Sequence, residues 1–209
     1  MKVNPLDNLP SLSKREALYI LTLDISELKL SSDYYKAVYH LANYPGRDTE
    51  NALMNFIQEE SFLNSVSIAQ RKAIEVLSKL GCTKAIDKIA NYLDSNNPYC
   101  VENAALALNE LGSNKKSYQE SIAFLLKDRK QNRRVLIQSL SGMDAINQLS
   151  NIKIILDNPD ESPSIRGAAI AAINKLNKQK EGLDEIESNL FLDNQNDRQC
   201  AVQDAIESS

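Results

Sequence analysis

The chain has 209 residues, of which 43% are hydrophobic and 25% are charged, as in ordinary folded proteins. Its net charge of −4 argues against a general nucleic-acid binder, because such proteins normally carry a basic excess. No stretch approaches the roughly 20 apolar residues of a membrane span, and the first ten residues lack the apolar segment of a signal peptide.

Capping residues and helix breakers predict helices in the N-terminal part of the chain. The first four are expected at residues 11–22, 31–44, 48–58 and 67–80. Pro45 and Gly46 end the second helix, and Gly81 ends the fourth. Glycine suits a helix end because it accepts the left-handed backbone conformation without strain.

From residue 84 onward the expected helices come in pairs. The pairs are 84–93 with 97–112, 117–126 with 132–143, 145–156 with 163–176, and 182–192 with 197–206. Pro98 opens its helix at a position where the missing N–H costs nothing, and Asp157-Asn158-Pro159 is a clear helix breaker. No segment shows the alternation that is typical of a strand.

A repeat with a period in the thirties runs through the middle of the chain. The hydrophobic residues that close successive repeats, Leu80, Leu111, Met143 and Leu176, are 31, 32 and 33 positions apart. This period, with a helix in each half, predicts an all-α fold, an α-solenoid of HEAT-like repeats. We expect a right-handed superhelix of about five to six helix pairs in a single domain, 1–209. Its N-terminal capping helix falls in 1–30, its repeats in 31–192 and its C-terminal cap in 193–209.

The inner helices of the expected pairs are rich in alanine. These alanines are Ala104, Ala105 and Ala107 in one helix, and Ala168, Ala169, Ala171 and Ala172 in another. Small side chains let helices of adjacent repeats approach closely, so the stability of the stack is collective. A charge at Ala105 is therefore expected to be severely destabilising.

Several segments resemble one known family. The segment from Tyr99 to Gly112, YCVENAALALNELG, looks like the HEAT-like repeat of phycobilin lyases, and DYYKAVYHLANY, from Asp33, is similar to a paired-aromatic helix of E-type lyase subunits. The segments RRVLIQSL, SIRGAAIAAINKL and RQCAVQDAIE resemble later repeats of the same family. By this resemblance, which runs from about residue 30 to the end, the chain is identified as a small, phycoerythrin-associated member of the E/F-type phycobilin lyases.

The resemblance implies a protein that handles an open-chain tetrapyrrole, phycoerythrobilin or phycocyanobilin, as a substrate that is not permanently bound. It implies a lyase, a lyase subunit or a lyase chaperone that helps to attach the bilin to a cysteine of a phycobiliprotein. The acceptor would be a phycobiliprotein subunit, and a second HEAT-repeat lyase subunit is a further expected partner. Two alternatives stay open: a protein-interaction scaffold that binds no pigment, and a bilin-binding factor in phycobilisome degradation.

Other classes of enzyme find no support in the sequence. It contains no glycine-rich phosphate loop, and a Ser/His/Asp triad has only the single histidine to draw on. The three cysteines and that histidine form no metal-binding pattern, and the cysteines are expected to be reduced thiols of a cytoplasmic protein.

Arginines recur near the start of successive inner helices. Arg71 and Arg134 stand nine residues before their closing hydrophobic residues, Arg166 stands ten before, and Glu102 takes this place in the repeat between. A bilin carries two propionates, so these arginines are candidate bilin ligands. The alternative is that they bridge to acidic groups of the adjacent repeat and hold the stack together.

The densest aromatic cluster comes in the second predicted helix. Tyr35 and Tyr39 lie four residues apart and share a helix face, and both are candidates for stacking on the tetrapyrrole. Tyr34 is expected on another face, and core filling is the alternative for each ring. His40 is a candidate proton donor near neutral pH, unless it is a histidine without a role.

The first turn of the central inner helix offers further candidates. Glu102 is a candidate catalytic residue that would accept from pyrrole N–H groups, and Tyr99 would contact the pigment. A glutamate in a first turn is also favoured by the helix dipole alone. Cys100 is expected to be a small buried thiol. Arg133 and Arg134 form a basic pair that would hold propionates, steer an acidic partner or simply begin a helix in solvent.

Overall fold

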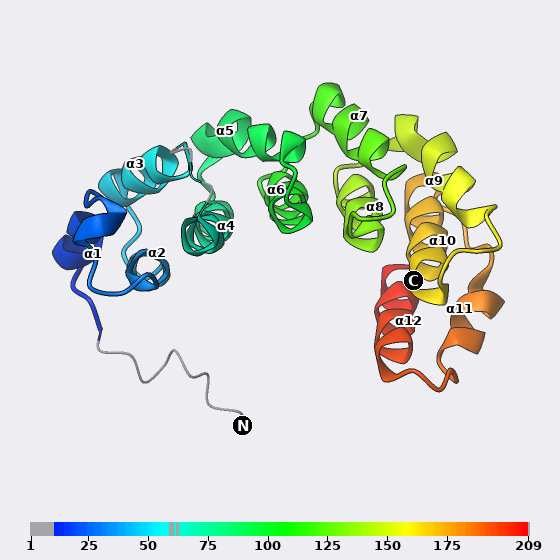
Figure 1. The fold of residues 1–209 in the computed structure, drawn as a ribbon. Helices are drawn as coiled ribbons and strands as arrows, with labels where there is room; N and C mark the ends of the chain where they lie inside the picture. Colours follow the sequence, from blue (N-terminus) through cyan, green and yellow to red (C-terminus); the bar gives the residue numbers. More distant parts are fainter. Residues whose placement is uncertain (1–10, 59–60, 62, 209) are drawn as a thin grey trace. The chain divides into compact units, whose positions relative to one another are not determined.

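The computed structural model of the chain describes residues 11–58, 61 and 63–208. Within this part the chain forms twelve α-helices with intervening turns and short 3-10 helices, and no strand. The predicted all-α solenoid is therefore confirmed (Figure 1). The first ten residues, for which no signal peptide is predicted, lie outside the described part.

The chain divides into two compact units, Met1–Ile89 and Ala90–Ser209. The helices of the first unit are α1 (Lys14–Ile20), α2 (Asp33–Leu41), α3 (Arg47–Phe56) and α4 (Asn64–Lys79), with a 3-10 helix at Ile25–Glu27. Helix α2 packs against both α1 and α4, and α3 packs against α4. The first unit thus has α2 and α4 in one layer and α1 and α3 in the other (Figure 1).

The second unit repeats this two-layer arrangement. Its helices are α6 (Pro98–Glu110), α7 (Lys116–Leu125), α8 (Arg133–Gly142), α9 (Leu149–Leu156), α10 (Pro163–Asn177), α11 (Leu183–Asn189) and α12 (Gln195–Glu207). Helix α8 lies between α6 and α10, and α12 packs on α10, which makes these four helices one layer. Helices α7, α9 and α11 cover them as the other layer (Figure 1).

Most of the predicted helix ends are found where local chemistry places them. Ser13 caps α1 in a capping box with Glu16, and Pro98 occupies the first turn of α6. Gly81 and Gly112 follow α4 and α6 with φ of +67°, the left-handed conformation that glycine adopts at low cost.

The helix predicted at 84–93 is not continuous. It consists of a 3-10 helix at Thr83–Ala85, α5 at Ile86–Ala90 and a second 3-10 helix at Asn91–Asp94. The start of the helix predicted at 145–156 is likewise a 3-10 helix, Ile146–Gln148, before α9. Tight 3-10 turns are frequent at the ends of short helices, and the apolar period alone does not distinguish them from α-helical turns.

Small residues allow close packing in the layer formed by α6, α8, α10 and α12. Ala105 on α6 and Ala169 on α10 are fully buried. Gly167 on α10 has no side chain, and a Cβ atom there would lie only 2.4 Å from the Oδ2 atom of Asp204 on α12. The glycine thus leaves room for the acidic side chain of Asp204 between the neighbouring helices α10 and α12.

Candidate functional site

The tyrosines at the start of α2 divide between the core and the surface of the first unit. Tyr34 is buried, its ring centroid lies 5.1 Å from that of Phe56, and its hydroxyl donates to the Leu23 carbonyl at 2.5 Å. The core alternative therefore describes Tyr34. Tyr35 and Tyr39 are half-buried, so part of each ring remains accessible on α2.

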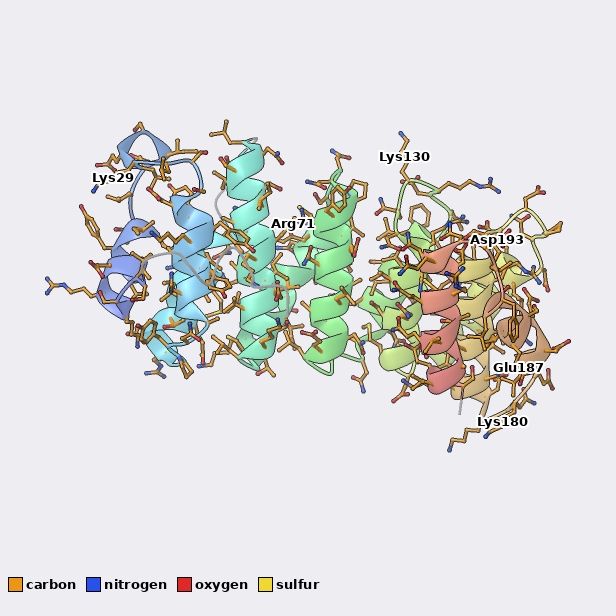
Figure 2. The ribbon with its side chains drawn as sticks, turned by 90° about the horizontal axis from the view of Figure 1, so that it is seen from below. Lys29, Arg71, Lys130, Lys180, Glu187 and Asp193 are labelled. Carbon is orange, nitrogen blue, oxygen red and sulfur yellow. The ribbon has the colours of Figure 1, made fainter. Side chains whose placement is uncertain are left out.

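A cation from α4 lies next to this aromatic face. The Nζ atom of Lys72 is 5.7 Å from the Tyr39 ring centroid, and it also donates to both Glu75 carboxylate oxygens at 2.9 and 3.0 Å. Arg71, the preceding residue, is labelled at α4 in Figure 2. It is half-buried. An aromatic ring and a cation thus meet between α2 and α4, a combination suited to a planar anionic ligand, and Tyr35 and Arg71 come from the same two helices.

His40 lies in a less polar setting than the sequence suggested. It is 8% exposed, the Tyr39 ring meets it edge-on at 5.6 Å, and its Nε2 atom is buried without a hydrogen-bond partner in the described part of the chain. Burial, and secondarily the nearby charge of Lys36, lowers the pKa of His40 below its ordinary value. At neutral pH the imidazole is therefore mostly uncharged, so only a small fraction of His40 carries the proton that a general acid would donate.

This setting predicts a pH dependence of stability that belongs to His40. Because the folded-state pKa is lowered, the unfolded chain takes up a proton first as the pH falls below about 6.5, so the folded state loses stability there. We expect the melting temperature to fall less between pH 7.5 and 5 in His40→Gln than in the unmodified chain. Parallel curves for the two proteins, measured by circular dichroism, would contradict the assignment.

The first turns of α6 place two predicted residues in the second unit. Tyr99 is 61% exposed, and Glu102 is half-buried; for its carboxylate the structure records no hydrogen bond or ion pair with the described residues. Cys100, between them in sequence, is buried as expected for a small core thiol. An accessible ring and an unengaged carboxylate thus lie on one helix of this unit.

Arg133 at the start of α8 is bound by a carboxylate of the protein itself. Its two terminal guanidinium nitrogens donate to the two oxygens of Glu161 at 2.6 and 2.5 Å, and both side chains are buried. Asn158 also donates to Glu161, at 3.2 Å, and the exposed Arg129 lies 3.9 Å from it. The pair joins α8 to the segment that precedes α10.

Arg134 forms the most extensive set of contacts of the candidate arginines. It donates to the carboxylate of Asp204 at 2.7 and 3.0 Å, to the Ser164 carbonyl at 2.6 Å and to the Cys200 carbonyl at 3.3 Å. One guanidinium group thereby links α8, α10 and α12. Burial raises the pKa of Asp204 above its ordinary value, although the hydrogen bonds from Arg134 act in the opposite direction. Burial by itself would lower the pKa of Arg134, but the hydrogen bonds to Asp204 outweigh it and the pKa is raised.

Arg166 on α10 follows the same pattern. Its guanidinium group donates to both carboxylate oxygens of Glu185 on α11, at 2.6 and 2.9 Å, and to the Leu156 carbonyl. Arg133, Arg134 and Arg166 thus each pair with a carboxylate from another element of the second unit. The sequence alone did not identify these partners, because it does not show which carboxylates lie next to these arginines in the fold.

A hollow of the second unit lies elsewhere. It measures about 760 Å³ and lies between the segment that begins α6 and helix α7, with Leu93, Asp94, Glu120 and Phe124 in its walls. None of the nine predicted site residues lines it. Residues 11–58, 61 and 63–208 include no cluster of three or more metal-binding side chains and no helix with the length and hydropathy of a membrane span.

Two curated proteins are similar to the chain in sequence, although no family model matches it. It is 38% identical to the bilin biosynthesis protein CpeY of Synechococcus sp. (strain WH8020) over 183 residues. These aligned residues make up 87% of this chain and 43% of that protein. It is 31% identical to the uncharacterized phycocyanin operon protein Y of Pseudanabaena tenuis (strain PCC 7409) over 199 residues. This alignment covers 95% of this chain and 47% of that protein. The chain thus spans less than half the length of these curated relatives.

A solved structure shares the fold. The complex of CpcE and CpcF of phycocyanin lyase from Nostoc sp. PCC7120 superposes with a TM-score of 0.77, at 23% sequence identity, over 98% of this chain and 80% of the matched chain. The helix layers and this match define the class of protein, a helical-repeat solenoid. In sequence the chain is thus similar to a bilin biosynthesis protein and a phycocyanin operon protein, and in fold it is similar to a phycocyanin lyase.

Proposed function

We propose that the chain acts in the covalent attachment of an open-chain tetrapyrrole to a cysteine of a phycobiliprotein subunit, in the cytoplasm, as a lyase, a lyase subunit or a lyase chaperone. The observation that carries the proposal is the 38% identity, over 87% of the chain, with a protein named for bilin biosynthesis. The chromophore would be phycoerythrobilin or phycocyanobilin. A second HEAT-repeat subunit is part of the proposal, because the structural match is a complex of two proteins of a phycocyanin lyase.

In the proposed reaction, the acceptor thiolate adds to the ethylidene carbon on ring A of the bilin. One carbon–sulfur bond forms, and a proton reaches the conjugated pigment. The nucleophile belongs to the acceptor, so this chain need not supply a cysteine. Its contribution would be to orient the pigment, to favour its protonated form and to exclude side reactions.

Each unit offers residues for this task. In the first unit, Tyr35 and Tyr39 would stack on the tetrapyrrole while Arg71 pairs with a propionate. In the second unit, Glu102 would accept hydrogen bonds from pyrrole N–H groups, and Tyr99 would contact the ring system. The buried position of His40 favours an indirect contribution, as a neutral side chain behind Tyr39.

The candidate arginines of the second unit would play a different part. Arg133, Arg134 and Arg166 would bind propionates only by exchanging them for carboxylates that they already hold at 2.5 to 3.0 Å. Each exchange would leave a carboxylate of the protein without its cation, which is costly where that carboxylate is buried. We therefore propose that these arginines maintain the surface on which the bilin lies.

The proposal is tested by co-expression of this chain with a bilin-producing pathway and individual apo-phycobiliprotein subunits. We expect pigment that survives on a denaturing gel, detected by zinc-enhanced fluorescence, to depend on this chain for one acceptor. A gain that also requires a larger lyase subunit would define a partner or chaperone. Absence of pigment in every combination, with no spectral shift when bilin is added to the purified protein, would contradict the proposal and favour the protein scaffold.

A bilin-binding factor in degradation is the remaining alternative. It would shift the bilin spectrum without forming a thioether. Within the lyase proposal, Glu102→Gln should diminish the absorbance band of the protonated bilin and slow attachment, whereas Glu110→Gln, an exposed position at the other end of α6, should change neither. Equal spectra for the two variants would remove Glu102 from the site.

A further inference from the structure

The most exposed large hydrophobic side chain in the described part of the chain is Phe191. It lies in the turn between α11 and α12 and is 85% exposed. An aromatic side chain in water at a surface turn contributes nothing to the core, and aromatic residues are the commonest anchors of protein interfaces. Phe191 therefore requires an explanation outside the second unit's own packing.

The turn that carries Phe191 is firmly held. Arg198 on α12 donates to the carbonyls of Leu192 and Asp193 at 2.6 and 2.8 Å, and the Phe191 amide donates to the Ser188 carbonyl at 3.2 Å. Asn194 then caps α12 by accepting from two backbone amides. A side chain presented on a rigid turn loses little conformational freedom when it binds, which favours its use as an anchor.

The surroundings of Phe191 are acidic. Between Lys180 and Arg198 the sequence contains no lysine or arginine, and Arg198 is engaged with the carbonyls of the turn. The exposed carboxylates of Glu187 and Asp193 project from this part of the unit (Figure 2). The partner surface for Phe191 should thus be an apolar hollow with a positively charged rim.

The second unit itself offers such a hollow, between α7 and α9. It measures about 200 Å³, several times the roughly 30 Å³ of one water, and has apolar walls from Leu126, Ile154 and Ile155. Lys127 and Arg129 also line it, while the third cation, Arg133, is neutralised by Glu161. Two positive charges are therefore left to attract an acidic surface.

We propose that Phe191 of one copy of the chain inserts into the hollow between α7 and α9 of a second copy. The aromatic ring matches the apolar walls, and Glu187 and Asp193 face Lys127 and Arg129. The two surfaces are different parts of one chain, so the contact is heterologous: each copy keeps a free anchor at one end and a free hollow at the other. Association should then continue beyond dimers as the concentration rises, and it should weaken with salt.

The test is sedimentation or light scattering of the purified full chain over a concentration series. We expect mass to rise with concentration, and the association to weaken at least tenfold in Phe191→Ala and in Arg129→Glu. Both positions are exposed, so helix content should stay unchanged. Phe191→Ala should keep the melting temperature, whereas Arg129→Glu, which brings a second carboxylate near Glu161, should lower it slightly. Tyr19→Ala, at a 63% exposed aromatic residue of the first unit, is the matched control and should associate like the unmodified chain.

Mixing the two variants gives the sharpest result. Arg129→Glu retains the anchor and Phe191→Ala retains the hollow, so together they should form a one-to-one pair that grows no further. A monomeric unmodified chain at all concentrations would overturn the proposal. So would unchanged association in Phe191→Ala, or an effect of Phe191→Ala confined to binding of an acceptor or of a second lyase subunit. Pigment attachment is measured separately, so neither result depends on the proposed function.

Discussion

Replacing Ala105 by aspartate is expected to lower the free energy of unfolding by more than about 4 kcal/mol, the range of the most destabilising single substitutions. Ala105 is fully buried on α6, which packs against α8. The buried carboxylate would lose its hydration without gaining a hydrogen-bond or ionic partner. Aspartate is also larger than alanine, so it would overpack the space between the closely packed helices. Denaturant unfolding followed by circular dichroism measures the loss.

An alanine on another helix provides the matched control. Ala52 lies in the middle of α3 and is half-buried, so the carboxylate of Ala52→Asp keeps contact with water. The same change at this position should therefore cost about 1 kcal/mol or less, chiefly through the lower helix propensity of aspartate. Similar losses for the two variants would show that the spacing between α6 and its neighbours is not tight.

The fold was largely predictable because its signals are local. Ser13, Pro98 and the glycines that end α4 and α6 act within one helical turn, and the recurrence of closing hydrophobic residues exposes the repeat directly. The segment 83–94 was predicted less well, since buried apolar residues at helical spacing fit both an α-helix and the shorter helix with 3-10 ends that forms there.

The candidate site was less predictable because its contacts are long-range. The carboxylate partners of Arg133, Arg134 and Arg166 are 28, 70 and 19 residues away along the chain. For Arg134 and Arg166 the sequence indicated both propionate binding and bridging between repeats, but it could not locate the carboxylates. For Arg133 it did not indicate bridging, and the solvated helix start considered for this residue is wrong, because its side chain is buried against Glu161. The burial of His40 was not predictable for the same reason, because it depends on how α2 packs against its neighbours and not on the type of residue.

The second large effect is expected at Arg134, which bridges helices of the second unit and, in our proposal, does not bind a propionate. We expect Arg134→Ala to lower the free energy of unfolding by about 3 kcal/mol, because it leaves the buried Asp204 carboxylate without its cation and two backbone carbonyls without their donor. Arg129→Ala is the matched control. Its guanidinium group is 66% exposed and 3.9 Å from Glu161, so the loss should be below about 1 kcal/mol.

A double variant separates the charge from the shape of the buried pair. In Arg134→Met with Asp204→Leu no charge is left unpaired, so we expect the free energy of unfolding to recover much of what Arg134→Ala loses. If Arg134 instead serves the pigment, Arg134→Ala would keep its denaturation midpoint and lose the bilin spectral shift. Measured on the same samples, midpoint and shift therefore distinguish a residue that holds α8, α10 and α12 together from one that holds a propionate.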